Sequence, residues 1–245
     1  MRTKTKSIII PLFLSIIITS CVEKRKGEIK TTALSNFLSV TDNEYRGVRE
    51  ILDFYGGYCE YSYHWNYSSE NGKTTDFGLE LSKSEVIDKL DLELVASHIA
   101  FLFYNELKEE KYNYKHIRTK LIGNKSSINK YNTDTLEIVK NKISLLNQTI
   151  NIVNNKNRRL LQEVFDSSVY QTSSDAFMDG IIKYEPRFGY INDFHFRGFK
   201  IIKSKNKYIL HLSAMLIREK EDSEFSIETD LDISNDKIYK LDYQL

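Results

Sequence analysis

The sequence predicts an α+β protein built from two small units, each with helices packed on an antiparallel sheet. Apolar residues recur at helical spacing in some segments and alternate every second residue in others. The last third of the chain holds four alternating segments in a row after the helical ones, which is typical of a meander packed on helices. A chain of 245 residues that is 41% hydrophobic is long and apolar enough to form such cores.

The first predicted unit, residues 34–123, has the order helix, two strands, helix, strand. The first helix stops at Gly56-Gly57, and Asn71-Gly72 favours a hairpin turn between the two strands. The five elements are expected at residues 36–55, 58–67, 75–81, 85–111 (with a break near Asp91) and 114–122. The polar stretch 123–132 that follows is rich in Asn, Lys and Ser, and we interpret it as the linker between the units.

One face of the strand at 58–67 carries a row of aromatic side chains. Because a neighbouring strand and a helix offer matching apolar faces, the row is expected to lie in the core. The alternative is a platform on which sugar rings stack, with Trp65 as its candidate ligand-binding residue. The row comprises Cys59, Tyr61, Tyr63, Trp65 and Tyr67.

The second predicted unit, residues 134–245, consists of helices followed by the four-stranded meander. A long helical pattern is interrupted at Asn154-Asn155, and a shorter helix stops before Pro186. The second strand of the meander is apolar on both sides, so we expect it to be covered on both faces. The helices are expected at 135–167 and 174–184, and the strands at 190–202, 207–218, 223–233 and 237–244.

The chain begins with the features of a secretory signal. Residues 1–6 are basic, residues 8–18 are apolar, and the small residues Thr19 and Ser20 precede Cys21. An apolar run of this length rises only about 16 Å as a helix, against the ~30 Å of a bilayer's hydrocarbon core. It is therefore too short to be a permanent membrane span.

The segment Ile18-Thr19-Ser20-Cys21 resembles the lipobox of bacterial lipoproteins. The resemblance implies cleavage before Cys21 and acylation of its thiol, for example by palmitate-containing chains, with residues 21–33 as a tether. Two or three acyl chains hold a protein on a membrane. The expected location is the cell envelope, lipid-anchored and facing the periplasm, because the residues after Cys21 are mostly basic and depart from the acidic run of surface-exported lipoproteins.

Loss of residues 1–20 also sets the charge and redox chemistry of the mature chain. It removes three basic residues from 35 and leaves 32 against 34 acidic ones, a net charge of −2. A near-neutral chain in which acidic and basic residues are interspersed shows no charge pattern of the kind that binds nucleic acid. Acylation of Cys21 leaves Cys59 as a lone thiol, so no disulfide within the chain is expected.

Residues 134–245 resemble NTF2-like and cystatin-like domains in the order of their elements. That resemblance implies a curved sheet around helices, often enclosing a pocket, and in pocket-forming NTF2-like enzymes an Asp/His pair acts as acid and base. Here the matching candidates are Asp193 and His195, with Arg197 and His211 as candidate ligand-binding residues. The alternative is that residues 193, 195 and 197 form a solvent-exposed face. A turn near Ser204 would place His211 opposite Gly198, too far along for a dyad with His195.

The sequence contains no local phosphate-loop, nucleophile-elbow or zinc motif, so it predicts no cofactor and no metal. We therefore favour a non-enzymatic lipoprotein that binds a small molecule or a protein partner. One alternative is an NTF2-like pocket enzyme using Asp193 and His195. Another is an immunity-type interaction factor whose acidic strand, carrying Glu224, Glu228, Asp230 and Asp232, faces a basic partner.

Overall fold

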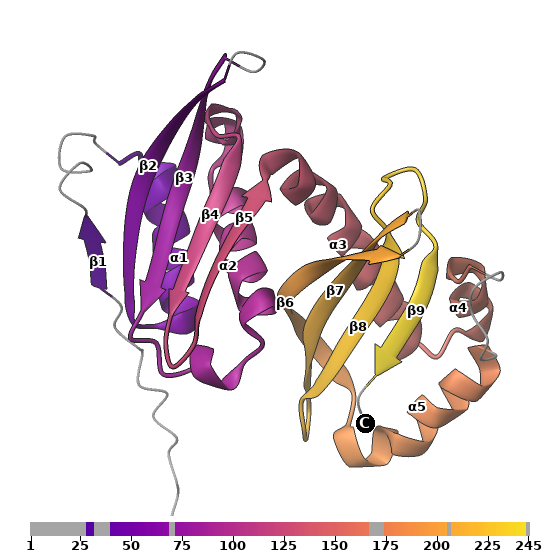
Figure 1. The fold of residues 1–245 in the computed structure, drawn as a ribbon. Helices are drawn as coiled ribbons and strands as arrows, with labels where there is room; N and C mark the ends of the chain where they lie inside the picture. Colours follow the sequence, from indigo (N-terminus) through magenta and orange to yellow (C-terminus); the bar gives the residue numbers. More distant parts are fainter. Residues whose placement is uncertain (1–27, 32–39, 69–71, 167–173, 205–206, 244–245) are drawn as a thin grey trace, which may run out of the picture.

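A computed structural model of the chain, described for residues 28–31, 40–68, 72–166, 174–204 and 207–243, confirms the α+β class (Figure 1). It contains one five-stranded sheet, here sheet A, and one four-stranded sheet, here sheet B, with helices packed against both. Within the described residues, no helix is both long and apolar enough to cross a membrane.

Sheet A has its strands in the order in which they occur in the chain, and it is mixed rather than purely antiparallel. The pairs β2–β3 and β4–β5 are antiparallel, whereas β3 and β4 are parallel. Parallel neighbours need a crossover connection, and α2 supplies it. The strands are β1 (Glu28–Thr31), β2 (Tyr58–Ser68), β3 (Gly72–Ser82), β4 (His116–Ile122) and β5 (Ser126–Asn132).

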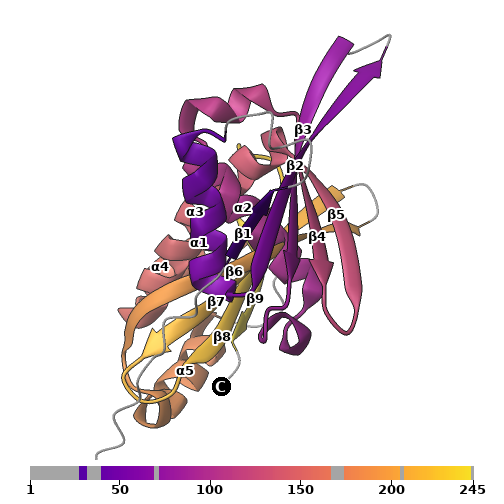
Figure 2. The same cartoon turned by 90° about the vertical axis from the view of Figure 1, so that its left-hand side faces the viewer.

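Helices α1 (Asp42–Tyr55) and α2 (Leu92–Glu106) cover one face of sheet A, and α1 is seen to one side of the strands in Figure 2. Thr41 and Glu44 form a capping box at the start of α1. Asp91 caps α2 by accepting hydrogen bonds from two backbone N–H groups, and this explains the break within the predicted helix 85–111. Short 3₁₀ turns, η2 (Ile87–Lys89) and η3 (Lys108–Asn113), flank α2.

The second half follows the predicted order of helices and meander. The first helix of this half ends at Asn154, and Asn157 caps the next one, so the predicted interruption lies within one residue of its expected place. The third helix continues through Pro186 to Phe188 rather than stopping before the proline. The elements are α3 (Thr133–Asn154), α4 (Arg158–Val164), α5 (Ser174–Phe188), β6 (Ile191–Ser204), β7 (Lys207–Arg218), β8 (Ser223–Asp230) and β9 (Ile238–Tyr243).

The two halves meet where β6 crosses α2. A Cβ atom on Gly198 would lie 2.1 Å from the backbone oxygen of Leu94, so only glycine allows this approach. The Phe199 backbone N–H donates a 2.8 Å hydrogen bond to the Ser97 hydroxyl, and Lys200 pairs with Asp91 at 2.6 Å. Sheet B is thus fixed directly on the helix that covers sheet A.

Three expectations about individual segments were wrong. Residues 126–132 form β5 rather than a linker, because their alternating side chains complete the edge of sheet A. Trp65 and Tyr67 are 50% and 85% exposed, because β2 extends beyond the helices that cover Cys59 and Tyr61. Strand β8 ends at Asp230, so Ile233 is exposed instead of inward-facing. The division into two separate domains stays a prediction.

Strand β7 is also covered less than expected. Its buried side chains alternate along the strand, and the residues between them are half-buried or exposed. One face of β7 packs in the core and the other borders solvent, which is the usual arrangement in an antiparallel sheet. The buried apolar side chains are those of Leu210, Leu212, Ala214 and Leu216, and Arg218 at the end of the strand is buried as well.

Candidate functional site

The predicted acid–base pair lies on the outer side of β6. Asp193 and His195 are both exposed, and they pair across the sheet with Ile217 and Met215. The Asp193 carboxylate accepts a 2.8 Å hydrogen bond from the next backbone N–H, that of Phe194. Both side chains thus belong to a solvent-exposed face of the sheet, and no enclosed pocket formed by the described residues surrounds the pair.

His211 lies opposite Lys200, not opposite Gly198 as expected from a turn near Ser204. The reason is that the strands pair as far as Ser204 with Lys207, which moves the turn one residue further along the chain. His211 is close to Glu228 instead, at 3.8 Å, and its pKa is lowered chiefly by burial. The structure therefore does not bring His211 to His195.

A β-bulge in β6 gives Arg197 its position. The register between β6 and β7 shifts between Phe196 and Gly198, so Arg197 is an extra residue without a direct partner. Gly198 has φ +127°, a backbone conformation that favours glycine, and it makes the close contact with α2 described above. The bulge thus places Arg197 where sheet B meets the beginning of α2.

Arg197 lines a pocket of about 230 Å³ at this junction, here the Arg197 pocket. Its walls come from parts of the chain that are far apart in sequence: the end of α1, the segment from η2 into α2, and strands β6, β7 and β8. Such junctions between packed units are common places for small-molecule sites. The lining residues are Tyr55, Lys89, Leu90, Asp91, Leu94, Val95, Arg197, Ser213, Ala214, Met215 and Glu224.

The charged side chains of the Arg197 pocket differ in their partners. Asp91 is engaged, because it caps α2 and pairs with Lys200. Within the described residues, the side chains of Arg197, Lys89 and Glu224 make no hydrogen bond or ion pair. The pocket therefore offers two cations and one carboxylate to a ligand.

Behind the pocket lies a buried pair of Tyr55 and His98. The Tyr55 hydroxyl and His98 Nδ1 are hydrogen-bonded at 2.8 Å, and the edges of Phe54 and Phe196 pack around the imidazole. Burial, reinforced by the nearby charge of Arg197, lowers the pKa of His98 to about 3. Burial also raises the pKa of Tyr55. Both groups are thus neutral at pH 7, and neither is poised to exchange a proton there.

A second polar cluster lies on the face of sheet A that the helices leave uncovered. Asp76 is completely buried there, and its carboxylate contacts His116 Nδ1 at 2.8 Å and accepts hydrogen bonds from Lys130 and Asn66 at 3.1 Å each. Burial acts to raise the pKa of Asp76, but the hydrogen bonds from His116 and Lys130 outweigh it and hold the pKa below its usual value. These contacts satisfy the carboxylate, so the cluster stabilises the sheet.

Beside this cluster, the Ser62 hydroxyl and His64 Nε2 are hydrogen-bonded at 2.9 Å. A serine–histidine pair needs an oxyanion site next to it for acyl transfer. The pair lies in the middle of a strand, where β2 and β3 are paired in register around it. Backbone N–H groups of a strand lie in the plane of the sheet, whereas these two side chains project from its face, so the strand itself directs no N–H group at the pair.

The remaining predicted candidates are dispersed over the surface. Trp65 lies on the projecting part of β2, where its ring is 6.5 Å from that of Tyr63. In the acidic row of β8, Glu228 lies 3.8 Å from both His211 and Lys240, so part of that charge is balanced within the sheet. Among the residues that the structure describes, no group of three or more His, Cys, Asp or Glu side chains is arranged to hold a metal ion.

Sequence reasoning named Arg197 as a ligand-binding candidate and Glu224 as part of an acidic row, but not Tyr55 or Lys89 as their neighbours. The pairing depends on the bulge at Arg197 and on the docking of β6 against α2. The only signal in the sequence is the Arg-Gly pair within an otherwise regular strand, since an isolated glycine in a strand favours a bulge.

Comparisons with known proteins add little. No family model matches the sequence, and no curated protein is significantly similar to it. One solved structure, that of Bd1075 from Bdellovibrio bacteriovorus, is similar over 75% of each chain with 9% sequence identity and a TM-score of 0.32. A similarity this weak carries no argument about fold or function.

Proposed function

We propose that this chain is a lipid-anchored protein of the bacterial cell envelope that binds a small zwitterionic ligand in the Arg197 pocket and does not transform it. Anchoring through Cys21 is inferred from the lipobox-like segment, which lies outside the described residues. The observation that carries the binding proposal is the half-buried Arg197 guanidinium, which the bulge holds in the pocket without a partner among the described residues.

The chemistry of the pocket favours a ligand with charges of both signs. A guanidinium presents a fork of N–H donors that matches a carboxylate, and Lys89 adds a second cation. Glu224 is an acceptor for an ammonium or amide N–H group. A volume of about 230 Å³ is below the ~300–1,000 Å³ typical of drug-sized ligands, so it fits an amino acid or a short peptide end.

Binding is favoured over catalysis by the protonation states around the pocket. The Tyr55 hydroxyl is kept protonated, because burial raises its pKa, and His98 is neutral and enclosed. The predicted acid–base residues Asp193 and His195 are exposed on β6 and do not line the pocket. No observation favours the immunity-type alternative, since the acidic strand is partly neutralised within its own sheet.

A thermal-shift screen of the purified protein tests the binding proposal. Amino acids and dipeptides should raise the unfolding temperature, whereas acetate or a simple amine should do so weakly. A ligand at about 100 times its Kd stabilises by ~2.7 kcal/mol. Arg197→Gln should abolish the shift, Glu224→Gln should remove the preference for zwitterions over simple carboxylates, and Arg159→Gln on exposed α4 should change nothing. Equal shifts in the wild type and in Arg197→Gln would refute the assignment.

The anchor is tested separately. Cys21→Ser should yield unprocessed precursor that incorporates no labelled palmitate, whereas the unmodified chain should be processed, labelled and retained in the membrane fraction. Normal processing and membrane retention of Cys21→Ser would contradict the lipoprotein proposal without affecting the ligand proposal.

A further inference from the structure

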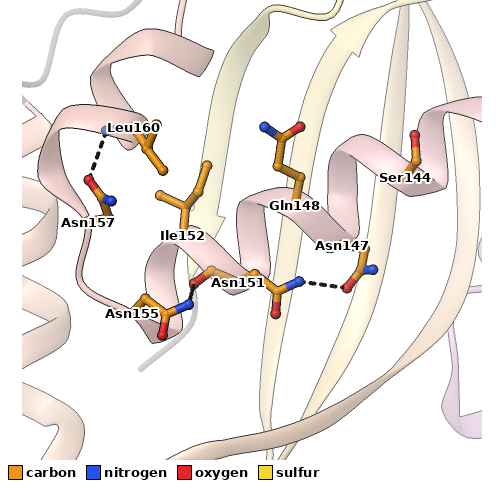
Figure 3. Close-up of a pocket in the computed structure, with 8 residues that line it drawn as sticks. All are labelled: Ser144, Asn147, Gln148, Asn151, Ile152, Asn155, Asn157 and Leu160. Atoms are coloured by element: carbon orange, nitrogen blue, oxygen red, sulfur yellow. Dashed lines mark hydrogen bonds between the residues drawn. The ribbon is translucent and has the colours of Figure 1, made fainter.

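A second concave surface, unrelated to the Arg197 pocket, lies on the helices of the second half. It is a groove of about 410 Å³ along the C-terminal part of α3 and the beginning of α4, here the amide groove (Figure 3). It is larger than the Arg197 pocket. Its lining residues are Ser144, Asn147, Gln148, Asn151, Ile152, Asn155, Asn157 and Leu160.

The amide groove is polar but carries no charge. Six of its eight lining side chains are amides or a hydroxyl, and none ionises. Figure 3 shows Asn147, Asn151 and Asn155 projecting in a row from successive turns of α3. The two remaining side chains, Ile152 and Leu160, are apolar; Ile152 is buried and Leu160 half-buried.

Much of the hydrogen-bonding capacity of the groove is unused by the protein. Asn151 Nδ2 donates to Asn147 Oδ1 at 3.3 Å, and Asn155 Nδ2 donates to the Asn151 backbone oxygen at 2.9 Å. Gln148 makes no hydrogen bond through its side chain within the described residues. Each amide has one acceptor oxygen and two donor hydrogens, so the groove presents both donors and acceptors.

Helix formation alone does not explain this composition. Asparagine is among the less favourable residues in a helix interior, by about 0.6 kcal/mol relative to alanine at an exposed position. Asn155 and Asn157 lie at helix ends, where asparagine is favourable, and Asn157 accepts the capping hydrogen bond from the Leu160 backbone N–H. Asn147 and Asn151 are exposed within α3, Asn151 in its last turn, and neither side chain caps a helix end.

We propose that the amide groove binds a neutral oligosaccharide. Neighbouring sugar hydroxyls each need a donor and an acceptor, and rows of side-chain amides supply both at once. The half-buried apolar side chain of Leu160 suits the C–H face of a sugar ring. With no cation in its lining, the groove offers no charged partner to a phosphate or carboxylate. This site is independent of the zwitterion site proposed above.

Titration of the full-length protein in a detergent without a sugar headgroup tests this inference. The probes are the tetrasaccharides of N-acetylglucosamine, of β-linked glucose and of α-linked glucose, each up to about 10 mM. At least one should bind with a Kd at or below the millimolar range, typical of weak, solvent-exposed contacts. Asn147→Ala and Asn151→Ala should each weaken that binding about tenfold or more.

Stability provides the control. Because alanine is the better helix former, Asn147→Ala and Asn151→Ala should leave the unfolding temperature unchanged or higher, so lost binding cannot result from unfolding. Asn141→Ala, also exposed on α3 but outside the groove, should bind as the wild type does, and so should Arg197→Gln. Absence of binding by all three probes, or undiminished binding by both groove variants, would overturn the proposal.

Discussion

The buried imidazole of His98 makes the stability of the protein depend on pH in a calculable way. Its pKa is lowered to about 3 in the folded protein, chiefly by burial, against ~6.5 in an unfolded chain. Because the folded pKa is depressed, the unfolded state binds one more proton than the native state between these values. The contribution of His98 to the free energy of unfolding is therefore fully present above pH 6.5. It is lost as the pH decreases below that value, by about 1.4 kcal/mol per pH unit.

Between pH 6 and pH 4, this single group should lower the free energy of unfolding by about 2.5 kcal/mol. His98→Asn removes the titration, and an asparagine amide still offers the Tyr55 hydroxyl a hydrogen-bonding partner. Urea unfolding at pH 6, 5 and 4 measures both proteins, and carboxylates that titrate in both cancel in the comparison. The wild type should lose about 2.5 kcal/mol more than the variant. Equal losses would show that His98 is not buried as a neutral imidazole.

Three further predictions test the packing around the sites. Gly198→Ala should lower the free energy of unfolding, measured in urea, by at least about 2 kcal/mol, because its Cβ would meet the Leu94 backbone. Gly180→Ala in α5 has open space around it and should raise the free energy of unfolding by up to about 1 kcal/mol. Similar effects of the two substitutions would contradict the close approach of β6 to α2. The thiol of Cys59 is buried, and its pKa is raised to about 12, first by burial and then by the charges of two glutamates. It should therefore react with a thiol reagent only after denaturation. Rapid reaction of the native protein would be inconsistent with a buried thiol. Asp76→Asn should destabilise the protein by about 3 kcal/mol at pH 7, because it leaves His116 and Lys130 without the charge of the buried carboxylate. A decrease in the free energy of unfolding below about 1 kcal/mol, measured by calorimetry, would show that the cluster contributes little to stability.

Local sequence patterns were sufficient for most of the secondary structure. Alternating and helical periodicities located the meander β6–β9 and the helix α1, and the capping residue Asp91 explains the predicted break. They were insufficient where an element reaches beyond its neighbours. The sequence predicts one apolar face from Cys59 to Tyr67, but helices cover only its first part. How far the helices extend along the strand depends on tertiary packing, which the local pattern does not encode.

The candidate site was less predictable for the same physical reason. Arg197 was identifiable as a charged residue on a strand, but its neighbours Tyr55, Lys89 and Glu224 are brought to it by the bulge and by the docking of Gly198 on α2. A bulge shifts the register of all residues after it, and periodicity cannot locate such a shift. The Asp76 cluster was missed because its members lie on four strands, two of them joined by a parallel pairing that the sequence did not indicate.

Methionine methyl resonances provide the most direct test of ligand binding in the Arg197 pocket. Met215 lines the pocket, whereas Met178 is buried in α5 and lies outside it, so one chain holds both the probe and its control. Adding the zwitterion that gives the largest thermal shift should move the Met215 resonance and leave that of Met178 in place, and Arg197→Gln should abolish the change. A ligand that stabilises the protein while leaving Met215 unshifted would contradict the assignment of the site.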